Sequence, residues 1–383
     1  MQLYLDHNAT SPLRPKAREA LLAALPAGNA SSVHGVGRAA RARVETAREQ
    51  VSALVGADPK AVTFTSGATE SIALALSPTM EIDGRPVSFD VLLVSGVEHP
   101  AVRAGGRFAV DRVEIVPVDA DGVVDLVALA ARMTGRRALV SVMAANNETG
   151  AIEPVRAVAD LVHGAGGVFH CDAVQIVGRV PFDLENSGAD LISISSHKLG
   201  GPQGAGALIA RNDDIRIPPL LRGGGQERGH RAGTESVAAI AGFGAAADEA
   251  RRNGATESAR VAALRDRLEA GIRATAPDVT ILSGSVARLP NTTCFAAPGI
   301  AAETAVIAFD LEGVAVSAGS ACSSGKVGPS QALKAMQVLP QLARGAVRAS
   351  LGWNSTEVDV DRFLEVWARV HAALTERRAT KAA

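Results

Sequence analysis

Length, composition and charge restrict the classes of protein to which this chain can belong. Its 383 residues exceed the size at which one hydrophobic core usually stops growing, so we expect two packed domains. Hydrophobic residues make up 47% of the chain and charged residues 21%, which is typical of a folded soluble protein, and a net charge of -1 leads us to expect no nucleic-acid or membrane partner. Because the N-terminus lacks a basic segment followed by an apolar stretch, and no run is long enough to span a bilayer, we expect a cytoplasmic protein.

The first two thirds of the chain have the pattern of a sheet with crossover helices. Two helices are predicted at residues 15–25 and 37–54, and from about residue 60 to 210 short β-branched runs alternate with helical patterns. Several of these runs are apolar throughout, which predicts strands covered on both faces and mainly parallel pairing. The predicted strands are 61–65, 91–95, 113–116, 138–143, 168–171, 191–195 and 207–210.

The last third has a different pattern, after a glycine run at residues 223–225 that predicts a loop. A long Ala-rich helix is predicted at 235–274, followed by strands at 279–282, 292–296, 314–317 and 346–350 and helices at 303–311 and 358–375. We therefore expect an α/β protein: a large domain over residues 12–255 with a mainly parallel seven-stranded sheet, and a smaller α+β domain formed by residues 1–11 and 256–383.

The three cysteines are far apart, odd in number and in no C-x-x-C pair, which argues against a disulfide framework and against a zinc site. Cys322 lies among small residues with little apolar area to bury, so we expect a mobile segment with an exposed thiol. Cys171 and Cys294 lie in predicted strands and are expected to be inert core thiols.

Two predicted strands end in residues that can carry chemistry. The strand at 191–195 leads through Ser195 and His197 to Lys198, and the strand at 168–171 leads to Asp172. Ligands of open α/β sheets bind at the carboxyl ends of strands, where a lysine can hold an aldehyde cofactor and an acid can face a pyridine nitrogen. The alternatives are a solvated loop lysine and a helix-capping carboxylate.

The segment TSGATE, residues 65–70, follows a predicted strand and opens a helix. The free N–H groups of that helix start, with the hydroxyls of Ser66 and Thr69, predict an anion pocket suited to a phosphate monoester. A plain helix start explains the same letters.

Taken in order, seven motifs resemble those of the cysteine desulfurases, which belong to the class-V branch of the fold-type I pyridoxal-phosphate enzymes. They are YLDHNAT (4–10), TSGATES (65–71), EH (98–99), NNETG (146–150), HCDAVQ (170–175), SSHK (195–198) and SAGSACS (317–323). The resemblance runs from residue 3 to at least Gly352, and the residues around Cys322 resemble the long-loop subgroup.

The resemblance implies a role for each matched residue in holding pyridoxal 5'-phosphate. Lys198 would bind the cofactor as a Schiff base, Asp172 would pair with the ring nitrogen, and His99 would stack on the ring and shuttle protons. Gln175 and Asn147 would lie at the ring hydroxyl. The phosphate would be bound by Ala68, Thr69, Ser195, His197 and, from the second subunit of a homodimer, Thr234.

The resemblance also implies the substrate and the reaction. Arg348 would bind the carboxylate of L-cysteine as a bidentate cation, with Asn29 and Asn147 beside it. Lys198 would remove the α-proton, Cys322 would attack the substrate sulfur, and L-alanine would leave a persulfide on Cys322 for a sulfur-acceptor or iron–sulfur scaffold protein. The sequence assigns no role to His34.

Two departures and several rivals stay open. Thr149 stands where the family often has Ile, and Ser196 where it usually has Gly or Ala. A selenocysteine lyase, a β-lyase releasing sulfide, or an aminotransferase would use the same scaffold, and a non-catalytic scaffold protein would need none of Lys198, Asp172, His99 and Cys322.

Overall fold

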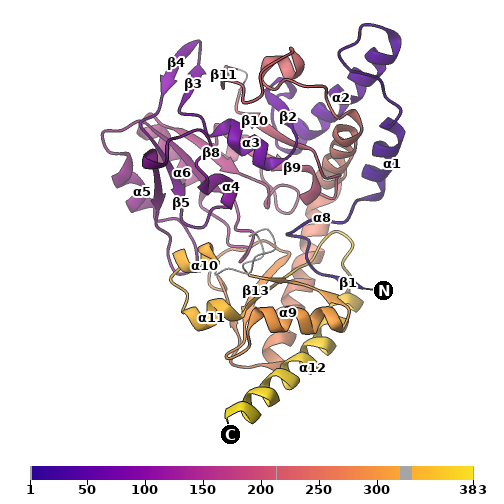
Figure 1. Ribbon diagram of the computed structural model, residues 1–383, viewed down its shortest axis with the longest axis vertical. Helices are drawn as coiled ribbons and strands as arrows, with labels where there is room; N and C mark the ends of the chain where they lie inside the picture. The colour runs from indigo at the N-terminus through magenta and orange to yellow at the C-terminus, as the bar shows by residue number, and fades with distance from the viewer. Residues whose placement is uncertain (1, 213, 320–329, 383) are drawn as a thin grey trace.

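The computed structural model describes residues 2–212, 214–319 and 330–382, which form two regions joined by one long helix. The first region is built on a seven-stranded sheet and the second on a four-stranded sheet. Helix α8 (Val237–Thr275) has 39 residues, about 58 Å at 1.5 Å per residue, and runs from the first region into the second (Figure 1).

The seven-stranded sheet is mainly parallel, as predicted. Only β10 runs antiparallel, to both of its neighbours, among the paired strands of this sheet. In spatial order the strands are β2 (Val62–Thr65), β10 (Gly206–Ala210), β9 (Leu191–Ser195), β8 (Val168–Asp172), β7 (Ala138–Met143), β5 (Val91–Ser95) and β6 (Val113–Val116). The predicted strands match these within one residue, which confirms the predicted fold class.

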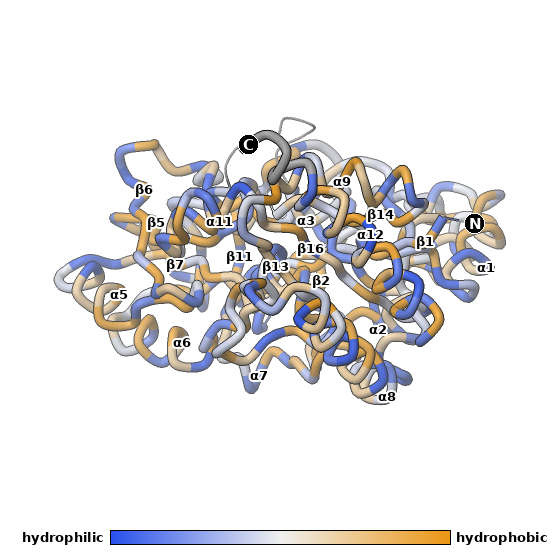
Figure 2. Tube along the Cα trace, turned by 90° about the horizontal axis from the view of Figure 1, so that it is seen from below, coloured by the Kyte–Doolittle hydropathy of each residue, from blue (hydrophilic) through white to orange (hydrophobic). Residues whose placement is uncertain are grey.

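Both faces of this sheet are covered, which explains why its central strands are buried at every position. On β5, Leu93 belongs to the hydrophobic cluster on one face and Leu92 to the cluster on the other, because side chains alternate along a strand. The covering helices are α1 (Pro15–Ala24), α2 (Gly35–Leu54), α3 (Ala68–Ala75), α4 (Pro100–Arg103), α5 (Leu126–Met133), α6 (Val155–Gly164), α7 (Leu184–Ser187) and the first half of α8 (Figure 1). Figure 2 shows hydrophobic and hydrophilic residues alternating along α2 and α8, as expected for helices with one face on a core.

The second region has an antiparallel sheet in the order β12 (Thr280–Ile281), β13 (Thr292–Ala296), β16 (Ala346–Ser350) and β15 (Ser317–Ala318). Its core holds Phe295, Phe309, Phe363 and Trp367, and the rings of Phe309 and Phe363 are stacked with centroids 5.1 Å apart. The helices of this region are α9 (Ala302–Leu311), α10 (Gln331–Ala335), α11 (Pro340–Gly345) and α12 (Glu357–Ala382).

The start of the chain belongs to this second region by packing. Strand β1 (Leu3–Tyr4) pairs in parallel with β14 (Val314–Ala315), and Leu5 is buried in the same cluster as Phe295. Residues 6–12 then cross toward the seven-stranded sheet. The domain limits at residues 11 and 255 stay a prediction.

A three-stranded sheet was not predicted. It consists of β11 (Ile215–Arg216), β3 (Thr79–Ile82) and β4 (Arg85–Ser88). The turn between β3 and β4 is Asp83-Gly84, with φ of 50° and 70°, a pair that favours a two-residue hairpin. The hairpin signal was therefore present in the sequence.

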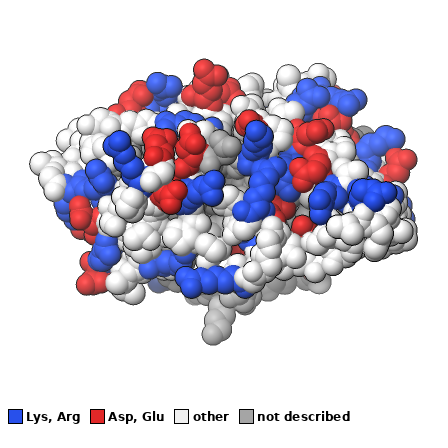
Figure 3. All heavy atoms as spheres, turned by 90° about the horizontal axis from the view of Figure 1, so that it is seen from above, with Lys and Arg blue, Asp and Glu red and all other residues white. Residues whose placement is uncertain are grey.

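The outer surface carries charges of both signs. On the face drawn in Figure 3, lysine and arginine atoms are interspersed with aspartate and glutamate atoms. None of the helices in the described part of the chain combines the length and the apolar character needed to cross a membrane.

Candidate active site

A cavity of about 670 Å³ lies at the carboxyl ends of β7, β8 and β9, opposite the start of α3. This is the edge of the sheet where ligands of open α/β proteins bind. Most of the site residues predicted from the sequence line it: Ala68, Thr69, His99, Asn147, Asp172, Gln175, Ser195, His197 and Lys198. The sheet therefore brings together residues as far apart in the chain as Ala68 and Lys198, which are 130 positions apart.

Lys198 reaches this cavity from a short 3-10 helix, Ser196–Lys198, that follows β9 directly. Its Nζ donates hydrogen bonds to the carbonyl oxygen of Ala9, at 2.9 Å, and to that of Asn8. The lysine side chain is thus held by the backbone of the segment that crosses between the two regions.

Asp172 is the last residue of β8 and is 5% exposed. Burial raises the pKa of its carboxyl group to about 6. Two weaker effects lower this pKa: the N–H of Val174 donates to Oδ1 at 3.0 Å, and the positive charge of Lys198 lies nearby. A carboxyl group in this setting gains from a nearby cation, so it is suited to face a protonated ring nitrogen.

His99 is the N-cap residue of α4, where Pro100 occupies the first helical position. Its Nδ1 accepts a hydrogen bond from the N–H of Ala101 at 3.2 Å, so the proton of the neutral ring lies on Nε2. Burial and the positive charge of Lys198 lower the pKa of His99 to about 4. The ring is therefore neutral at pH 7 and offers one N–H donor.

One part of the cavity lining, at the start of α3, is rich in hydrogen-bond donors. The first N–H groups of α3 have no partner within the helix, and Thr69, Ser195 and His197 line the same wall. The backbones of Gly206 and Gly67 pack closely here, since a Cβ on Gly206 would lie 2.6 Å from the carbonyl carbon of Gly67. The wall fits a phosphate group.

The two departures from the family pattern lie beside this wall and beside the ring end. The buried hydroxyl of Ser196 has no hydrogen-bond partner, and a Cβ on Gly201 would lie 2.3 Å from it. The hydroxyl of Thr149 accepts from the N–H of Ala151 at 3.2 Å, within the turn that presents Asn147. Neither residue lines the cavity.

Gln175 and Asn147 are both buried and both connect to Asn8. Gln175 donates from Nε2 to the carbonyl oxygen of Asn8 at 3.1 Å, and the amide of Asn8 donates to the carbonyl oxygen of Asn147 at 3.1 Å. Burial and the charge of Arg348 lower the pKa of Arg179 to about 9, and its guanidinium donates to Oδ1 of Asn8 at 2.9 Å. Asn8 and Arg179 carried no prediction, although Asn8 lies inside the quoted motif at residues 4–10.

Arg348 lies in β16, 1% exposed, directly behind Asn147 and outside the cavity lining. It donates from Nη1 to the carbonyl oxygen of Asn147 at 2.8 Å and from Nη2 to Oδ1 of Asp6 at 2.7 Å. Its Nε is buried without a partner. Arg348 therefore already holds one carboxylate, that of Asp6, and sequence reasoning missed this partner.

Four further residues named from the sequence stand apart. Asn29 does not line the cavity, and its Oδ1 accepts from the N–H of Ser31 at 2.8 Å. Thr234 is exposed on its own chain. His34 caps the start of α2, where Nδ1 accepts from the N–H of Gly37 at 3.2 Å. Cys322 lies outside the described residues.

The other two cysteines are buried core thiols, as predicted. Cys171 and Cys294 are both 0% exposed. Burial raises the pKa of Cys171 well above its usual value and that of Cys294 to about 12. Neither thiol is a nucleophile at neutral pH.

The residues around the cavity fit pyridoxal phosphate by their chemistry. The cavity lining includes an acid, the N–H groups of a helix start, hydroxyls, an amine and a neutral imidazole. Buried in one cavity, this donor and acceptor set matches a cofactor with a basic ring nitrogen, an aldehyde and a phosphate.

Comparison with known proteins agrees with this geometry. The class-V aminotransferase family matches residues 3–363. A cysteine desulfurase from Cereibacter sphaeroides is 44% identical over 372 residues, 95% of this chain and 94% of the relative, and one from Gluconacetobacter diazotrophicus is 42% identical over 382 residues, 98% of this chain and 94% of the relative. The X-ray structure of a NifS-like protein from Rickettsia africae is 32% identical with a TM-score of 0.87, covering 97% of this chain and 100% of that one. This chain belongs to the cysteine desulfurase family of the class-V aminotransferases.

Proposed function

We propose that this chain, a pyridoxal-phosphate-dependent cysteine desulfurase, converts L-cysteine to L-alanine and retains the sulfur as a persulfide on Cys322. The observation that carries the proposal is the single cavity lined by Lys198, Asp172 and His99 with a phosphate-type wall opposite. A non-catalytic scaffold would have no use for this set of groups. The close relatives named above support the choice of reaction.

Each end of the cofactor has proposed partners. Lys198 would hold the cofactor through its aldehyde, Asp172 would pair with the ring nitrogen, and His99 would contact the ring. When bound, pyridoxal phosphate supplies an electron-withdrawing ring that accepts the electron pair released at the substrate Cα. Asn147 and Gln175 are the proposed partners of the ring hydroxyl. Ala68, Thr69, Ser195 and His197 are the proposed phosphate ligands, with Thr234 of the partner subunit.

Proton transfer falls to Lys198 and His99. Once freed by the incoming substrate amine, Lys198 Nζ takes the proton from the substrate Cα. His99 has a pKa of about 4, lowered by burial and by Lys198, so it stays neutral through turnover at pH 7. It can therefore donate a hydrogen bond from Nε2 without adding a positive charge beside the amine.

Sulfur transfer requires no external oxidant. The thiolate of Cys322 attacks the substrate sulfur, an S–S bond forms, and the C–S bond breaks with its electron pair staying on carbon, which then takes a proton. The net change is L-cysteine plus the Cys322 thiol to L-alanine plus the Cys322 persulfide. Because Cys171 and Cys294 are fully buried, neither can replace Cys322 in this step.

The substrate carboxylate is proposed to bind at Arg348, with Asn147 and Asn29 beside it. Arg348 has an unpartnered buried Nε, so its guanidinium retains a free donor next to the two that are in use. A planar guanidinium suits a carboxylate better than an ammonium group does.

The wider setting is also proposed. The chain is expected to act as a cytoplasmic homodimer of the long-loop subgroup, in which the exposed Thr234 completes the partner's phosphate site. The persulfide is expected to pass to a sulfur-acceptor protein, such as a scaffold for iron–sulfur cluster assembly.

The test is mass spectrometry of the peptide that contains Cys322 after incubation with L-cysteine. Cys322→Ala is expected to keep the cofactor absorption band and to form no persulfide, and Cys294→Ala is the matched control that should still form it. Lys198→Ala is expected to lose the absorption band of the Schiff base. Persulfide formation by Cys322→Ala at the rate of the unmodified enzyme would refute the assignment of Cys322.

A further inference from the structure

Asn8 lies between the two sheets and is 1% exposed. Its side-chain Nδ2 donates to the carbonyl oxygen of Asn147 at 3.1 Å and to Oγ1 of Thr292 at 2.9 Å. Its Oδ1 accepts from Arg179 Nη1 at 2.9 Å and from Asn291 Nδ2 at 3.0 Å. A primary amide has two N–H donors and one oxygen with two lone pairs, so these contacts use its full capacity. The side chain is fixed from both regions of the molecule.

The backbone of Asn8 is fixed as well. Its N–H donates to Oγ of Ser350 at 2.9 Å, and its carbonyl oxygen accepts from Gln175 Nε2 at 3.1 Å. The same carbonyl oxygen accepts from Lys198 Nζ, and the next carbonyl, of Ala9, accepts from Nζ at 2.9 Å. A neutral amine has enough N–H groups to donate to both carbonyl oxygens, but the negative ends of the two carbonyl dipoles stabilise the charged ammonium form more.

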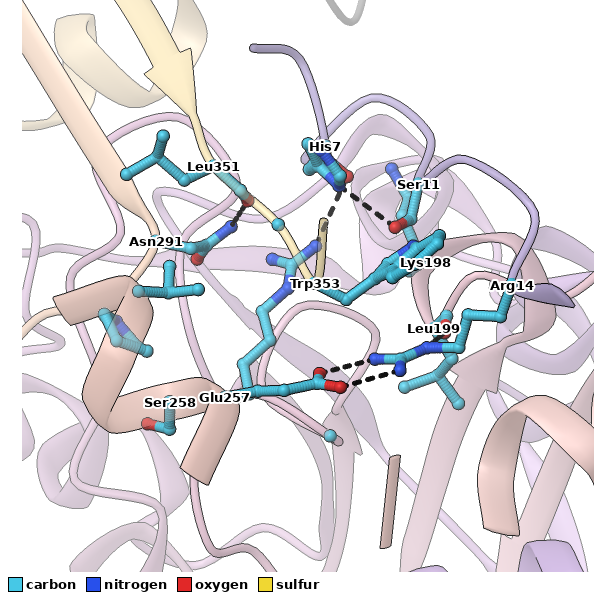
Figure 4. A pocket seen from close by; sticks show the side chains of 15 residues that line it. His7, Ser11, Arg14, Lys198, Leu199, Glu257, Ser258, Asn291, Leu351 and Trp353 are labelled. Carbon is cyan, nitrogen blue, oxygen red and sulfur yellow. Dashed lines mark hydrogen bonds and ion pairs between the residues drawn. The ribbon is translucent and has the colours of Figure 1, made fainter. Parts of the chain in front are cut away.

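Lys198 stands at the wall between two cavities. It lines the cofactor cavity, and it also lines a second cavity of about 50 Å³, drawn in Figure 4, which Asn291 lines from the other side. The second cavity has room for water molecules. The carbonyls of Asn8 and Ala9 hold the amine of Lys198, which lines both cavities.

Other charged groups facing the amine act in both directions. The carboxyl group of Asp172 interacts with Lys198 and favours the ammonium form, whereas the guanidinium of Arg179, bound to the Asn8 side chain, opposes it. Burial, then the charge of Lys198, lowers the pKa of both His99 and His197 to about 4, so these rings are neutral at pH 7. The carbonyl oxygens of Asn8 and Ala9 are in hydrogen-bond contact with Nζ.

We propose that the carbonyls of Asn8 and Ala9 hold Lys198 as an ammonium group in the cofactor-free protein and after its amine has taken the substrate proton, and that the Asn8 side chain is the positioning residue that keeps them in place. The proposal rests on the proposed role of Lys198 as the cofactor lysine. In the proton transfer, the Cα–H bond of the substrate breaks, its electron pair passes to the bound cofactor, and an N–H bond forms on Nζ. The two carbonyl oxygens then accept hydrogen bonds from the resulting ammonium.

The first test uses the cofactor-free protein. The rate of acetylation of Lys198 by an amine-reactive ester is measured against pH by peptide mass spectrometry, with the exposed Lys16 in the same sample as the internal reference. Asn8→Ala frees the carbonyls to move, so at pH 8 the acetylation of Lys198 is expected to rise about threefold to tenfold. Asn8→Asp places a negative charge near the amine and is expected to slow it.

The second test uses the loaded enzyme and measures exchange of the Cα proton of L-alanine in D₂O by NMR. Asn8→Ala is expected to lower this exchange about tenfold while the cofactor absorption band is retained. Ile272→Val, buried in the core of the second region and away from Asn8, is the control for loss of stability alone. Thr292→Val, which removes one acceptor of the Asn8 amide, is a milder variant if Asn8→Ala does not fold.

Faster acetylation of Lys198 in Asn8→Ala together with slower acetylation in Asn8→Asp would support the proposal. A purely structural role would change the acetylation rate in the same direction in both variants. Unchanged Lys198 acetylation in Asn8→Ala, or an equal change in Ile272→Val, would overturn it. The two proposals can fail separately. Retention of the Schiff-base absorption band by Lys198→Ala would reject Lys198 as the cofactor lysine, whereas the acetylation rates would still report on the contacts between Lys198 and the two carbonyls.

Discussion

Asp172→Asn is expected to stabilise the cofactor-free protein while weakening cofactor binding. The carboxyl group of Asp172 has its pKa raised from 3.8 to about 6, chiefly by burial. Because the folded state holds the proton more tightly than the unfolded state, Asp172 destabilises the fold progressively as pH rises from about 4 to about 6, and by a constant amount above that range. At 1.36 kcal/mol per pKa unit, the full effect is about 3 kcal/mol.

The pH dependence gives the prediction its sharpest form. Removal of the ionisable group contributes about 1 kcal/mol at pH 4.5 and about 3 kcal/mol at pH 7.5 to the unfolding free energy of Asp172→Asn, and after the cost of the buried amide the net gain is about 0 and about 2 kcal/mol. The new amide keeps an acceptor for the N–H of Val174, but its NH₂ group is buried, which takes back about 1 kcal/mol at both pH values. The difference between the two pH values is therefore the quantity to compare.

Urea unfolding of the cofactor-free protein at pH 4.5 and 7.5 measures these free energies. Asp160→Asn is the matched control, because Asp160 is an exposed carboxylate paired with Arg156 on α6 and its change should stay within about 0.5 kcal/mol. A gain for Asp172→Asn that is the same at both pH values would refute the reasoning, as would a loss of stability at pH 7.5.

Two further substitutions are expected to affect substrate binding and fold stability separately. Arg348→Lys cannot offer a bidentate guanidinium, so the KM for L-cysteine should rise about 30-fold with an unchanged cofactor absorption band, and an unchanged KM in steady-state alanine release would contradict the role of Arg348. Glu227→Ala removes the buried partner of Arg48, whose guanidinium lies 2.8 Å from the carboxylate, and should lower the unfolding free energy by about 3–5 kcal/mol without removing any group that lines the cofactor cavity. Urea unfolding measures this loss, and a change below 1 kcal/mol would show that Arg48 finds another partner.

Most of the sheet could be predicted from the sequence because its strands carry a strong local signal. Strands β5, β7, β8 and β9 are buried at every residue, so short runs rich in apolar and β-branched residues marked them, even where β8 and β9 include His or Ser. The direction of β10 had no such signal, since pairing direction depends on the connections and on the neighbours rather than on the residues of the strand. The β3–β4 hairpin was missed although Asp83-Gly84 announces it, because its strands are half exposed and short.

The site was predictable where a residue type performs its own chemistry at a strand end. Asp172 and Ser195 end buried strands and Lys198 comes three residues after one, so their placement at one edge of the sheet followed from the strand assignments. Asn8 had no comparable signal. Its importance lies in partners at positions 147, 179, 291, 292 and 350, and only the folded chain brings these together.

Four buried acidic side chains near the carboxyl ends of the parallel strands destabilise the fold at neutral pH. Burial raises the pKa of Glu98 well above its usual value, that of Glu148 to about 7 and that of Glu153 to about 8, and Asp172 joins them at about 6. Each raised pKa lowers folded stability at neutral pH, because the unfolded chain ionises these groups freely. For Asp172 the bound cofactor offers an offset, since a protonated ring nitrogen stabilises the ionised carboxylate. Cofactor binding at this edge of the sheet should therefore raise stability more at pH 7 than at pH 4.5, the same pH trend that removal of the carboxyl group produces in the cofactor-free chain.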